Sequence, residues 1–266
     1  MDRTPIVAGQ FYPGSRSALQ EEVAKYLQGS PSLEKTLLAM VPHAGYVFSG
    51  STAGKTIARS HLAERIVLIG PNHTGRGRKL AVWNDGKWIF PGSLVPVDSG
   101  LAAAILEQPG FSADYEAHLY EHSLEVVLPF LQAVKKDLSV VPVAVAEPGL
   151  ENLLAAGKNL ALAIQESGQE TTLVVSSDMS HFISRHEAEE KDRMAIDRIL
   201  DLDPEGLYRT VRSNNISMCG MLPMVLGLSC VKELGAQKAA LVDYTTSGEV
   251  NRDYSQVVGY AGILVS

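Results

Sequence analysis

The hydrophobic and polar positions of this chain form short apolar runs that alternate with longer stretches of helical periodicity. Apolar runs of four to eight residues bounded by Gly, Pro or polar residues are typical of buried strands, whereas apolar residues recurring every three to four positions are typical of amphipathic helices. The predicted strands are Thr36–Val41, Arg65–Ile69, Leu138–Val145, Thr171–Ser176, Ala239–Tyr244 and Gly259–Val265. The predicted helices are Ser17–Leu27, Ser51–His61, Ser123–Val134, Leu150–Gln165, Glu187–Leu200, Pro204–Arg212 and Cys219–Leu234.

Strands that alternate with helices favour an α/β fold, in which a mixed, largely parallel sheet lies between layers of helices. No internal repeat, low-complexity tract or linker divides the chain, so residues 1–266 are predicted to form a single layered domain. Asn84-Asp85-Gly86 has the composition of a tight turn. We therefore expect Lys79–Trp83 and Lys87–Phe90 to pair as a β-hairpin.

Composition and charge narrow the class of protein. The content of 45% hydrophobic and 20% charged residues is that of a soluble globular protein. The net charge of −7, without any run of Lys or Arg, argues against nucleic acids and anionic membranes as partners. No apolar run reaches the ~18 residues of a membrane span, and the first residues lack the apolar segment of a signal peptide. We therefore expect a cytoplasmic protein with no membrane partner.

Histidines follow three of the predicted strands. His43 and His73 come shortly after the first two, and His181 follows Asp178 beyond the strand Thr171–Ser176. Ligands of open α/β sheets bind beyond the carboxyl ends of the strands, so these side chains could form one metal or acid–base site. Taken alone, each histidine could as easily have a structural role as a functional one. Asp178 could cap a helix, or it could orient the imidazole of His181.

Two further residues have both a functional and a structural interpretation. His122 begins a predicted helix, where it could cap the helix, face solvent or pair with Glu125 one turn on. Cys219 lies near the start of another predicted helix, where a thiol pKa is lowered; the alternative is a small buried apolar residue. Cys230 lies among apolar residues on the same helix, ~16 Å along it, too far for a disulfide.

The segment Gly50–Thr56 is similar to a phosphate-binding loop but does not match it. That motif needs four residues between its glycines, and here Gly50 and Gly54 are separated by three. The small residues are better explained as the start of a helix that packs closely against a strand.

The chain resembles the Memo family along nearly its whole length. The resemblance rests on several motifs that occur in order, each too short to be specific by itself. They are Val7-Ala8-Gly9-Gln10-Phe11-Tyr12-Pro13, Pro42-His43-Ala44-Gly45-Tyr46 with Ser49-Gly50, Gly70-Pro71-Asn72-His73, Glu121-His122-Ser123-Leu124-Glu125 with Leu128-Pro129-Phe130-Leu131-Gln132, Ser176-Ser177-Asp178-Met179-Ser180-His181, and Cys219-Gly220.

The resemblance implies a fold similar to that of class III extradiol ring-cleaving dioxygenases, which hold non-haem iron with two histidines and one glutamate. It implies that His43 and His73 are metal ligands and that His181 is an acid–base residue. Memo proteins have a cysteine, here Cys219, in place of the glutamate. A thiolate favours copper(I), zinc or a differently tuned iron. From the residues alone, Asp178 stays open as an alternative to Cys219.

Three hypotheses about function follow. The first is a metal-dependent redox enzyme, in which iron or copper (or zinc) is held by His43, His73 and Cys219. In that enzyme Asp178 orients His181, which moves protons, and His122 lines the pocket. The second is a metal carrier or sensor without catalysis. The third is a module that binds a small molecule, a peptide or a partner protein. The resemblance adds roles as signalling adaptors in animals and, in many prokaryotes, a neighbouring radical-SAM enzyme as a candidate partner.

Overall fold

A computed structural model describes residues 1–31 and 34–266 of the chain. Within these residues, nine strands join in one sheet, in the order β10-β11-β1-β8-β2-β7-β3-β6, with β9 paired to β11. The strands are β1 (Leu38–Val41), β2 (Arg65–Pro71), β3 (Leu80–Val82), β6 (Ser112–Ala113), β7 (Ser139–Val145), β8 (Thr171–Ser176), β9 (His181–Ile183), β10 (Ala239–Thr246) and β11 (Val257–Val265).

The centre of the sheet is parallel. β1, β8, β2 and β7 are neighbours that all run in one direction, so their carboxyl ends meet at a single edge. β11 and β3 flank this centre as antiparallel strands. The four central strands are almost entirely buried, which explains why they occur in the sequence as continuous apolar runs rather than as alternating patterns. The prediction of an α/β fold with a mixed sheet is confirmed.

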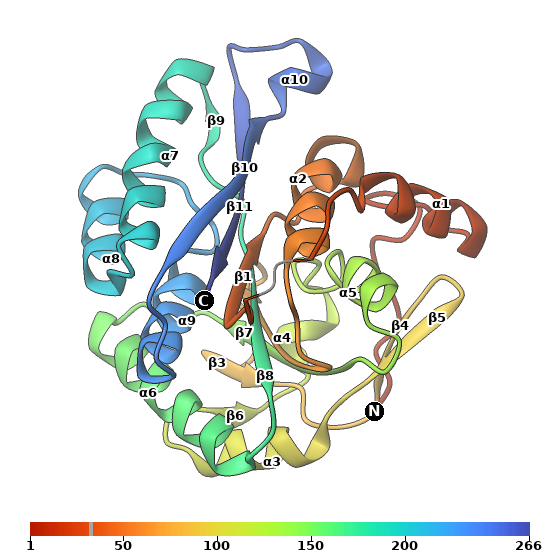
Figure 1. Cartoon of the computed structure of the whole chain (residues 1–266), viewed down its shortest axis with the longest axis vertical. Coiled ribbons are helices and arrows are strands. Elements are labelled where there is room, and N and C mark those ends of the chain that lie inside the picture. The colour runs from red at the N-terminus through yellow and green to blue at the C-terminus, as the bar shows by residue number, and fades with distance from the viewer. Residues whose placement is uncertain (32–33) are drawn as a thin grey trace.

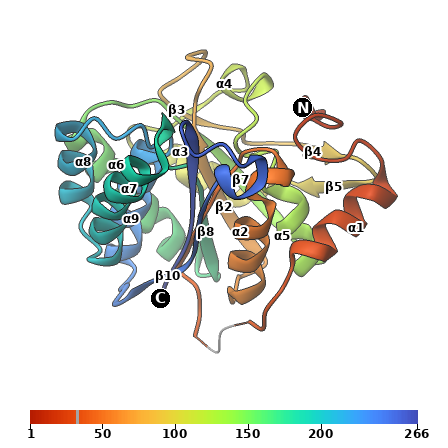
Figure 2. The same ribbon diagram turned by 90° about the horizontal axis from the view of Figure 1, so that it is seen from above.

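Helices cover both faces of the sheet (Figure 1), and the view from above separates the two layers (Figure 2). One core cluster is shared by the sheet and α1, α2 and α5, and the other by the sheet and α3, α6, α7, α8 and α9. The helices are α1 (Arg16–Tyr26), α2 (Tyr46–Arg59), α3 (Ser99–Glu107), α4 (Glu116–Leu119), α5 (Leu128–Val134), α6 (Leu150–Ser167), α7 (Arg185–Leu200), α8 (Pro204–Ser213), α9 (Met221–Glu233) and α10 (Gly248–Asn251).

The glycines of the segment similar to a phosphate loop lie inside α2 and serve helix packing. A Cβ added to Gly54 would lie 2.5 Å from the carbonyl oxygen of Tyr26, and one added to Gly50 would lie 2.6 Å from the ring of that residue. Only glycine allows the end of α1 to approach α2 so closely. The two glycines therefore serve a contact between helices. The threonines of the same segment lie against a strand, as predicted, since a Cβ added to Gly262 of β11 would overlap Oγ1 of Thr56.

The predicted hairpin around Asn84-Asp85-Gly86 is wrong. β3 pairs with β7 and β6 in the main sheet, whereas β4 (Lys87–Phe90) pairs with β5 (Ser93–Pro96) in a separate two-stranded sheet. All three residues of β3 are buried, which explains why that strand enters the core instead of the hairpin. The turn of the real hairpin contains Gly92, whose φ of +76° is one that glycine adopts without strain.

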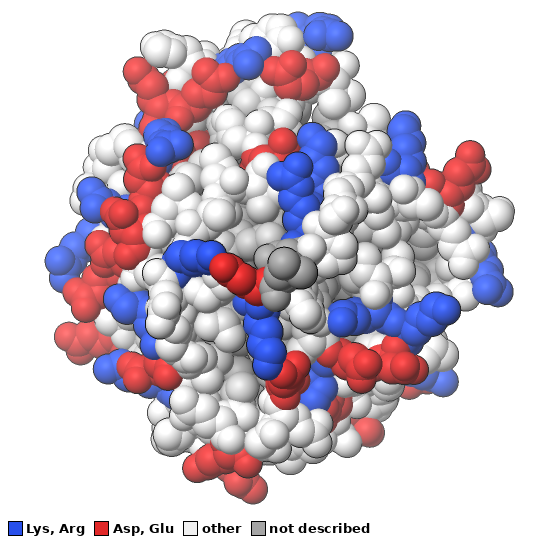
Figure 3. Space-filling model, viewed as in Figure 1, with Lys and Arg blue, Asp and Glu red and all other residues white. Residues whose placement is uncertain are grey.

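In the described part of the chain, no helix combines the length and the apolar character needed to cross a membrane. On the face drawn in Figure 3, basic and acidic side chains are interspersed rather than gathered in one basic patch.

His118, in α4, is a fully buried histidine. The centroid of its ring lies 5.8 Å from the ring centroids of both Trp83 and Trp88. Its Nε2 lies 3.1 Å from the carbonyl oxygen of Ala81, so Nε2 carries the proton and donates it. Nδ1 is buried and has no hydrogen-bond partner among the described residues. Burial lowers the pKa of His118 to about 4, because a proton on Nδ1 would be left unsolvated.

This histidine is expected to make the protein less stable in mild acid. At His118 the unfolded chain binds a proton at the usual histidine pKa of about 6.5, and the folded chain does not. The contribution of neutral His118 to the free energy of unfolding is therefore lost as pH falls from 6.5 towards 4. Between pH 7 and pH 5 the loss is about 2 kcal/mol. His118→Gln keeps a donor for Ala81 but cannot titrate. The free energy of unfolding, measured with urea at pH 7 and pH 5, should change less with pH in this variant than in the unaltered protein. An equal change in the two proteins would contradict the lowered pKa of His118.

Candidate metal centre

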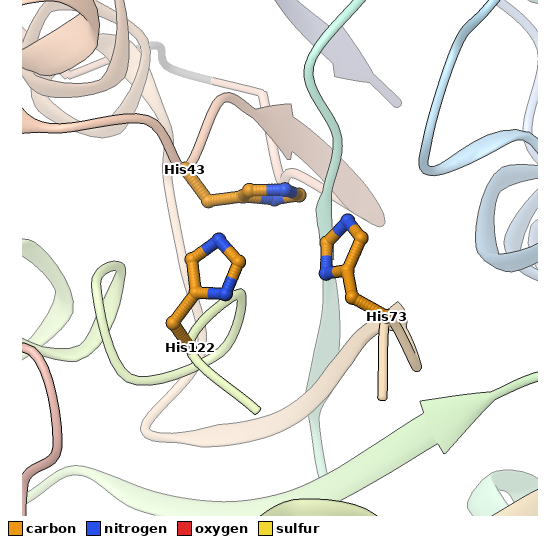
Figure 4. Close-up of side chains that lie close together, drawn as sticks. All are labelled: His43, His73 and His122. Atoms are coloured by element: carbon orange, nitrogen blue, oxygen red, sulfur yellow. The ribbon is translucent and has the colours of Figure 1, made fainter. Parts of the chain in front are cut away.

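Three adjacent parallel strands deliver polar residues to the same edge of the sheet. His43 lies two residues beyond the end of β1, His73 two beyond β2, and Asp178 two beyond β8. A fourth residue, His122, comes from the irregular segment that precedes α5. The imidazoles of the three histidines point toward one another (Figure 4). Each offers a ring nitrogen within 4.8 Å of those of the other two, close enough for one metal ion to bind them all.

The ring of His43 is buried and held in one tautomer. Its Nδ1 lies 2.5 Å from the hydroxyl of Ser176, and that hydroxyl donates its own proton to the carbonyl oxygen of Ser123 at 2.7 Å. The hydroxyl can therefore only accept from His43, so Nδ1 carries the proton. The lone pair of Nε2 is left free to bind a metal.

The ring of His73 is held by a buried carboxylate. Its Nδ1 lies 2.9 Å from Oε1 of Glu121, and its backbone N–H donates to Oε2 at 2.6 Å. Nδ1 therefore carries the proton here as well, and Nε2 is free. A carboxylate or hydroxyl that accepts from the second ring nitrogen is the usual support of a metal-binding histidine.

His122 does not begin a helix as predicted, because α5 starts only at Leu128, with Pro129 in its first turn. Its Nδ1 lies 3.5 Å from Oε1 of Glu121, and its ring packs edge-on with that of Phe11, with centroids 4.9 Å apart. The proposed pairing with Glu125 is wrong, since that carboxylate binds elsewhere. His122 thus faces the other two histidines, but hydrogen bonds fix its ring less firmly than theirs.

Glu125 instead forms a buried ion pair with Arg3, whose Nη1 lies 2.7 Å from Oε2. The carboxylate also accepts from the backbone N–H groups of Ile6 and Val7 and from the hydroxyl of Tyr12. Arg3 in turn donates from Nη2 to the carbonyl oxygen of Glu121 at 2.5 Å. The N-terminal segment is therefore tied to the segment that carries Glu121 and His122.

Cys219 lies at the same centre, two residues before α9. Its Sγ is 3.4 Å from Nε2 of His43 and accepts a hydrogen bond from the backbone N–H of Asp178 at 3.2 Å. The expectation of a lowered thiol pKa is wrong: burial and the carboxylate of Asp178 raise the pKa of Cys219. Cys230 is a buried free cysteine in the interior of α9, as predicted.

Asp178 and His181 make contacts that differ from those predicted. Oδ1 of Asp178 accepts from the backbone N–H of His43 at 2.8 Å, so this carboxylate holds the loop after β1 rather than the ring of His181. His181 is instead fixed by Ser217, whose carbonyl oxygen lies 3.0 Å from Nδ1 and whose hydroxyl accepts from the backbone N–H at 2.8 Å. Nε2 of His181 is therefore the nitrogen with a free lone pair.

Charge at the centre is distributed unevenly. Burial and the neighbouring imidazoles lower the pKa of His43 well below its ordinary range, and burial lowers that of His122. Burial also acts on His73, but the bond to Glu121 outweighs it and raises the pKa of that ring. Burial acts against the charge of Glu121, but His73 outweighs it and lowers the pKa of that carboxylate to about 2. His43 and His122 are thus neutral near pH 7, the form that binds metals.

The donor groups fit a transition-metal ion. Imidazole nitrogens suit zinc, copper and iron, and a thiolate adds a preference for the softer of these, whereas magnesium and calcium require oxygen ligands. Sequence reasoning did not identify Glu121 or Ser176 as supports of His73 and His43. Glu121 stands beside His122 in a motif that did attract notice, but its partner His73 is 48 positions away, and no local pattern reveals such a contact.

Comparisons with known proteins agree with the resemblance seen in the motifs. The family model described as "Memo-like protein" matches residues 3–264. A "MEMO1 family protein" of Aquifex aeolicus is 40% identical over 264 residues, covering 98% of each chain. One of Methanopyrus kandleri is 39% identical over 279 residues, covering 99% of each chain. An uncharacterised protein of Escherichia coli K12 shares the fold, with a TM-score of 0.54, 15% identity and coverage of 85% of this chain and 99% of that one.

Glu121 is expected to control metal affinity without touching the metal. Glu121→Gln removes the charge that fixes the tautomer of His73, so zinc(II) affinity should fall by about 10- to 100-fold, the usual effect of losing such a support. Competition with a chromophoric chelator measures it. Glu116→Gln, an exposed carboxylate on the nearby α4, is the matched control and should leave the affinity unchanged. Equal affinities for the two variants would show that Glu121 does not support a ligand.

Proposed function

Because the chain belongs to the Memo family and brings three imidazoles and a thiol together at one edge of its sheet, we propose that it is a metal-dependent redox enzyme. The ion is iron or copper, held by His43, His73 and Cys219. The observation that carries the proposal is the pair of hydrogen bonds, to Ser176 and Glu121, that leave the Nε2 lone pairs of His43 and His73 available to a metal.

Cys219 is assigned as the third ligand, in preference to His122, for two reasons. Its sulfur lies 3.4 Å from Nε2 of His43, about the separation of two donor atoms that share a tetrahedral metal ion. It also accepts the N–H of Asp178, a bond that favours the thiolate that a metal requires. The ring of His122 packs against Phe11, but its approach to a carboxylate, Oε1 of Glu121 at 3.5 Å, is longer than a firm hydrogen bond, so it has weaker polar support than His43 and His73.

The bound metal supplies electron transfer and activation of a ligand, and the surrounding residues supply the rest. His181, with Nδ1 committed to Ser217, can accept or donate a proton at Nε2. His122 is neutral near pH 7 and faces the same space, so it is a second group able to hold a proton. Asp178 positions both ligands that it contacts, through the backbone of His43 and the sulfur of Cys219.

Three substitutions test the ligand set. His43→Ala and Cys219→Ser should each abolish tight binding of copper(I) and iron(II), since each removes a ligand, while His122→Ala should bind either metal within about tenfold of the unaltered protein. Anaerobic competition titrations give the affinities, and circular dichroism verifies the folds. Loss of the metal in His122→Ala together with its retention in Cys219→Ser would replace this set by the three histidines.

His181→Ala should separate metal binding from turnover. The variant is expected to hold the metal as tightly as the unaltered protein and to lose about 10²–10⁴-fold in rate, the usual contribution of an acid–base group. Oxygen consumption and metal oxidation state, followed with each metal in turn, provide the readout. Metal loss in this variant would make His181 a ligand. If the unaltered protein binds metal and shows no turnover in any such assay, the protein is a carrier or sensor.

A further inference from the structure

Phe182, the residue after His181, has a strained backbone conformation that no helix end explains. Four non-glycine residues in the described part of the chain have a positive φ. Three of them lie one or two residues after the end of a helix, where a left-handed residue closes the last turn; they are Leu202, Asn215 and Arg252. Phe182, with a φ of +58°, lies instead in β9. A bulky residue in this conformation is unusual and is disfavoured by contact of its Cβ with the backbone.

The strain arises at a β-bulge. His181 pairs with Val258 of β11 and Ile183 with Val257, so Phe182 is an additional residue without a partner on the other strand. Bulges occur often beside functional sites, where they redirect a side chain. On a regular strand, neighbouring side chains point to opposite faces. Here the rings of His181 and Phe182 lie together, with centroids 5.9 Å apart in an edge-on arrangement.

Phe182 gains little from packing. Its side chain is 71% exposed, more than any other large apolar side chain in the described part of the chain. Leu202, also strained, is 9% exposed and belongs to the core, so its burial offsets its conformation. Strain that is not balanced by burial points to a role outside the stability of the fold.

Contacts connect Phe182 to the metal centre. His181 is bonded to Ser217, and Cys219, two residues further on, has its sulfur 3.4 Å from Nε2 of His43. Two residues span at most about 7 Å, so a short series of contacts, through His181 and Ser217, joins the ring of Phe182 to the sulfur of Cys219. Tyr120 and Val47, 61% and 59% exposed, lie two residues before His122 and four after His43. After Phe182, these are the most exposed large apolar residues in the described part of the chain.

We propose that Phe182 is a substrate-positioning residue, whose ring receives an aromatic or apolar group of the molecule that reacts at the metal. This inference rests on the proposed function, since it requires a ligand that enters the metal centre. The left-handed bulge turns the ring to the side of His181, where it contacts the part of the substrate that projects beyond the histidines. Removal of the ring should weaken the preference for ligands with such a group and leave the metal bound.

The test compares two probes, 4-phenylimidazole and imidazole, on zinc(II)-loaded and on metal-free protein. Both probes offer the same nitrogen donor, and only the first has a ring that can reach Phe182. Titrations followed by ¹H–¹⁵N NMR give the two dissociation constants and report contact through the amides of His181–Ile183. Phe182→Asn should decrease the preference for 4-phenylimidazole by roughly two- to tenfold, the value of one aromatic contact. Phe182→Trp should restore it.

The variants are expected to fold, because asparagine tolerates a positive φ and the ring is not packed. Leu162→Ala, which removes a 45% exposed apolar side chain from α6, is the control and should leave the preference unchanged. An unaltered preference in Phe182→Asn, or a lowered melting temperature that makes the ring structural, overturns the proposal. Failure of the protein to bind zinc(II), copper(I) and iron(II) alike overturns instead the metal assignment on which it rests. Amide shifts at residues 181–183 in the metal-free protein would then support the contact of Phe182 with the probe independently.

Discussion

The buried carboxylate of Glu121 is the group on which the metal centre depends. It accepts hydrogen bonds from the backbone and ring of His73 and from the backbone of Ser123, and it lies beside His122. These bonds join the loop after β2 to an irregular, buried segment whose polar groups would otherwise be unsatisfied. The carbonyl of Glu121 receives Arg3, which also pairs with Glu125, so the N-terminal segment is held by the same network.

The sheet provides the second constraint. Because β1, β8 and β2 are parallel neighbours, residues two positions beyond each strand are brought together whatever their separation in the chain. His43, Asp178 and His73 occupy these positions, and Cys219 approaches from the segment before α9. Hydrogen bonds then orient these side chains. Ser176 sets the tautomer of His43, and Glu121 sets that of His73. Asp178 bonds to the backbone of His43 and to the sulfur of Cys219. The strands thus bring the residues of the site together, and polar contacts fix the orientation of their side chains.

Patterns local to the chain allowed the central strands and most helices to be predicted, because burial on both faces leaves continuous apolar runs. The short strands β5, β6 and β9 were not predicted. They also placed His43 and His73 at one edge. The hairpin failed because a turn sequence cannot reveal that β3 pairs with β7, more than fifty residues away. The orientation of His181 by Asp178 and the lowered pKa of Cys219 failed for a similar reason: Ser217 and the depth of the site are set by long-range packing that no short pattern encodes.

X-ray absorption spectroscopy of the metal-loaded protein tests the central claim most directly, since it identifies the atoms bound to the ion. We expect imidazole nitrogens at ~2.0–2.1 Å and one sulfur at ~2.3 Å, distances typical of such ligands, with the sulfur shell absent in Cys219→Ser. A spectrum with three imidazoles and no sulfur would contradict it. The metal would then bind His43, His73 and His122, and Cys219 would be only a neighbour of the site.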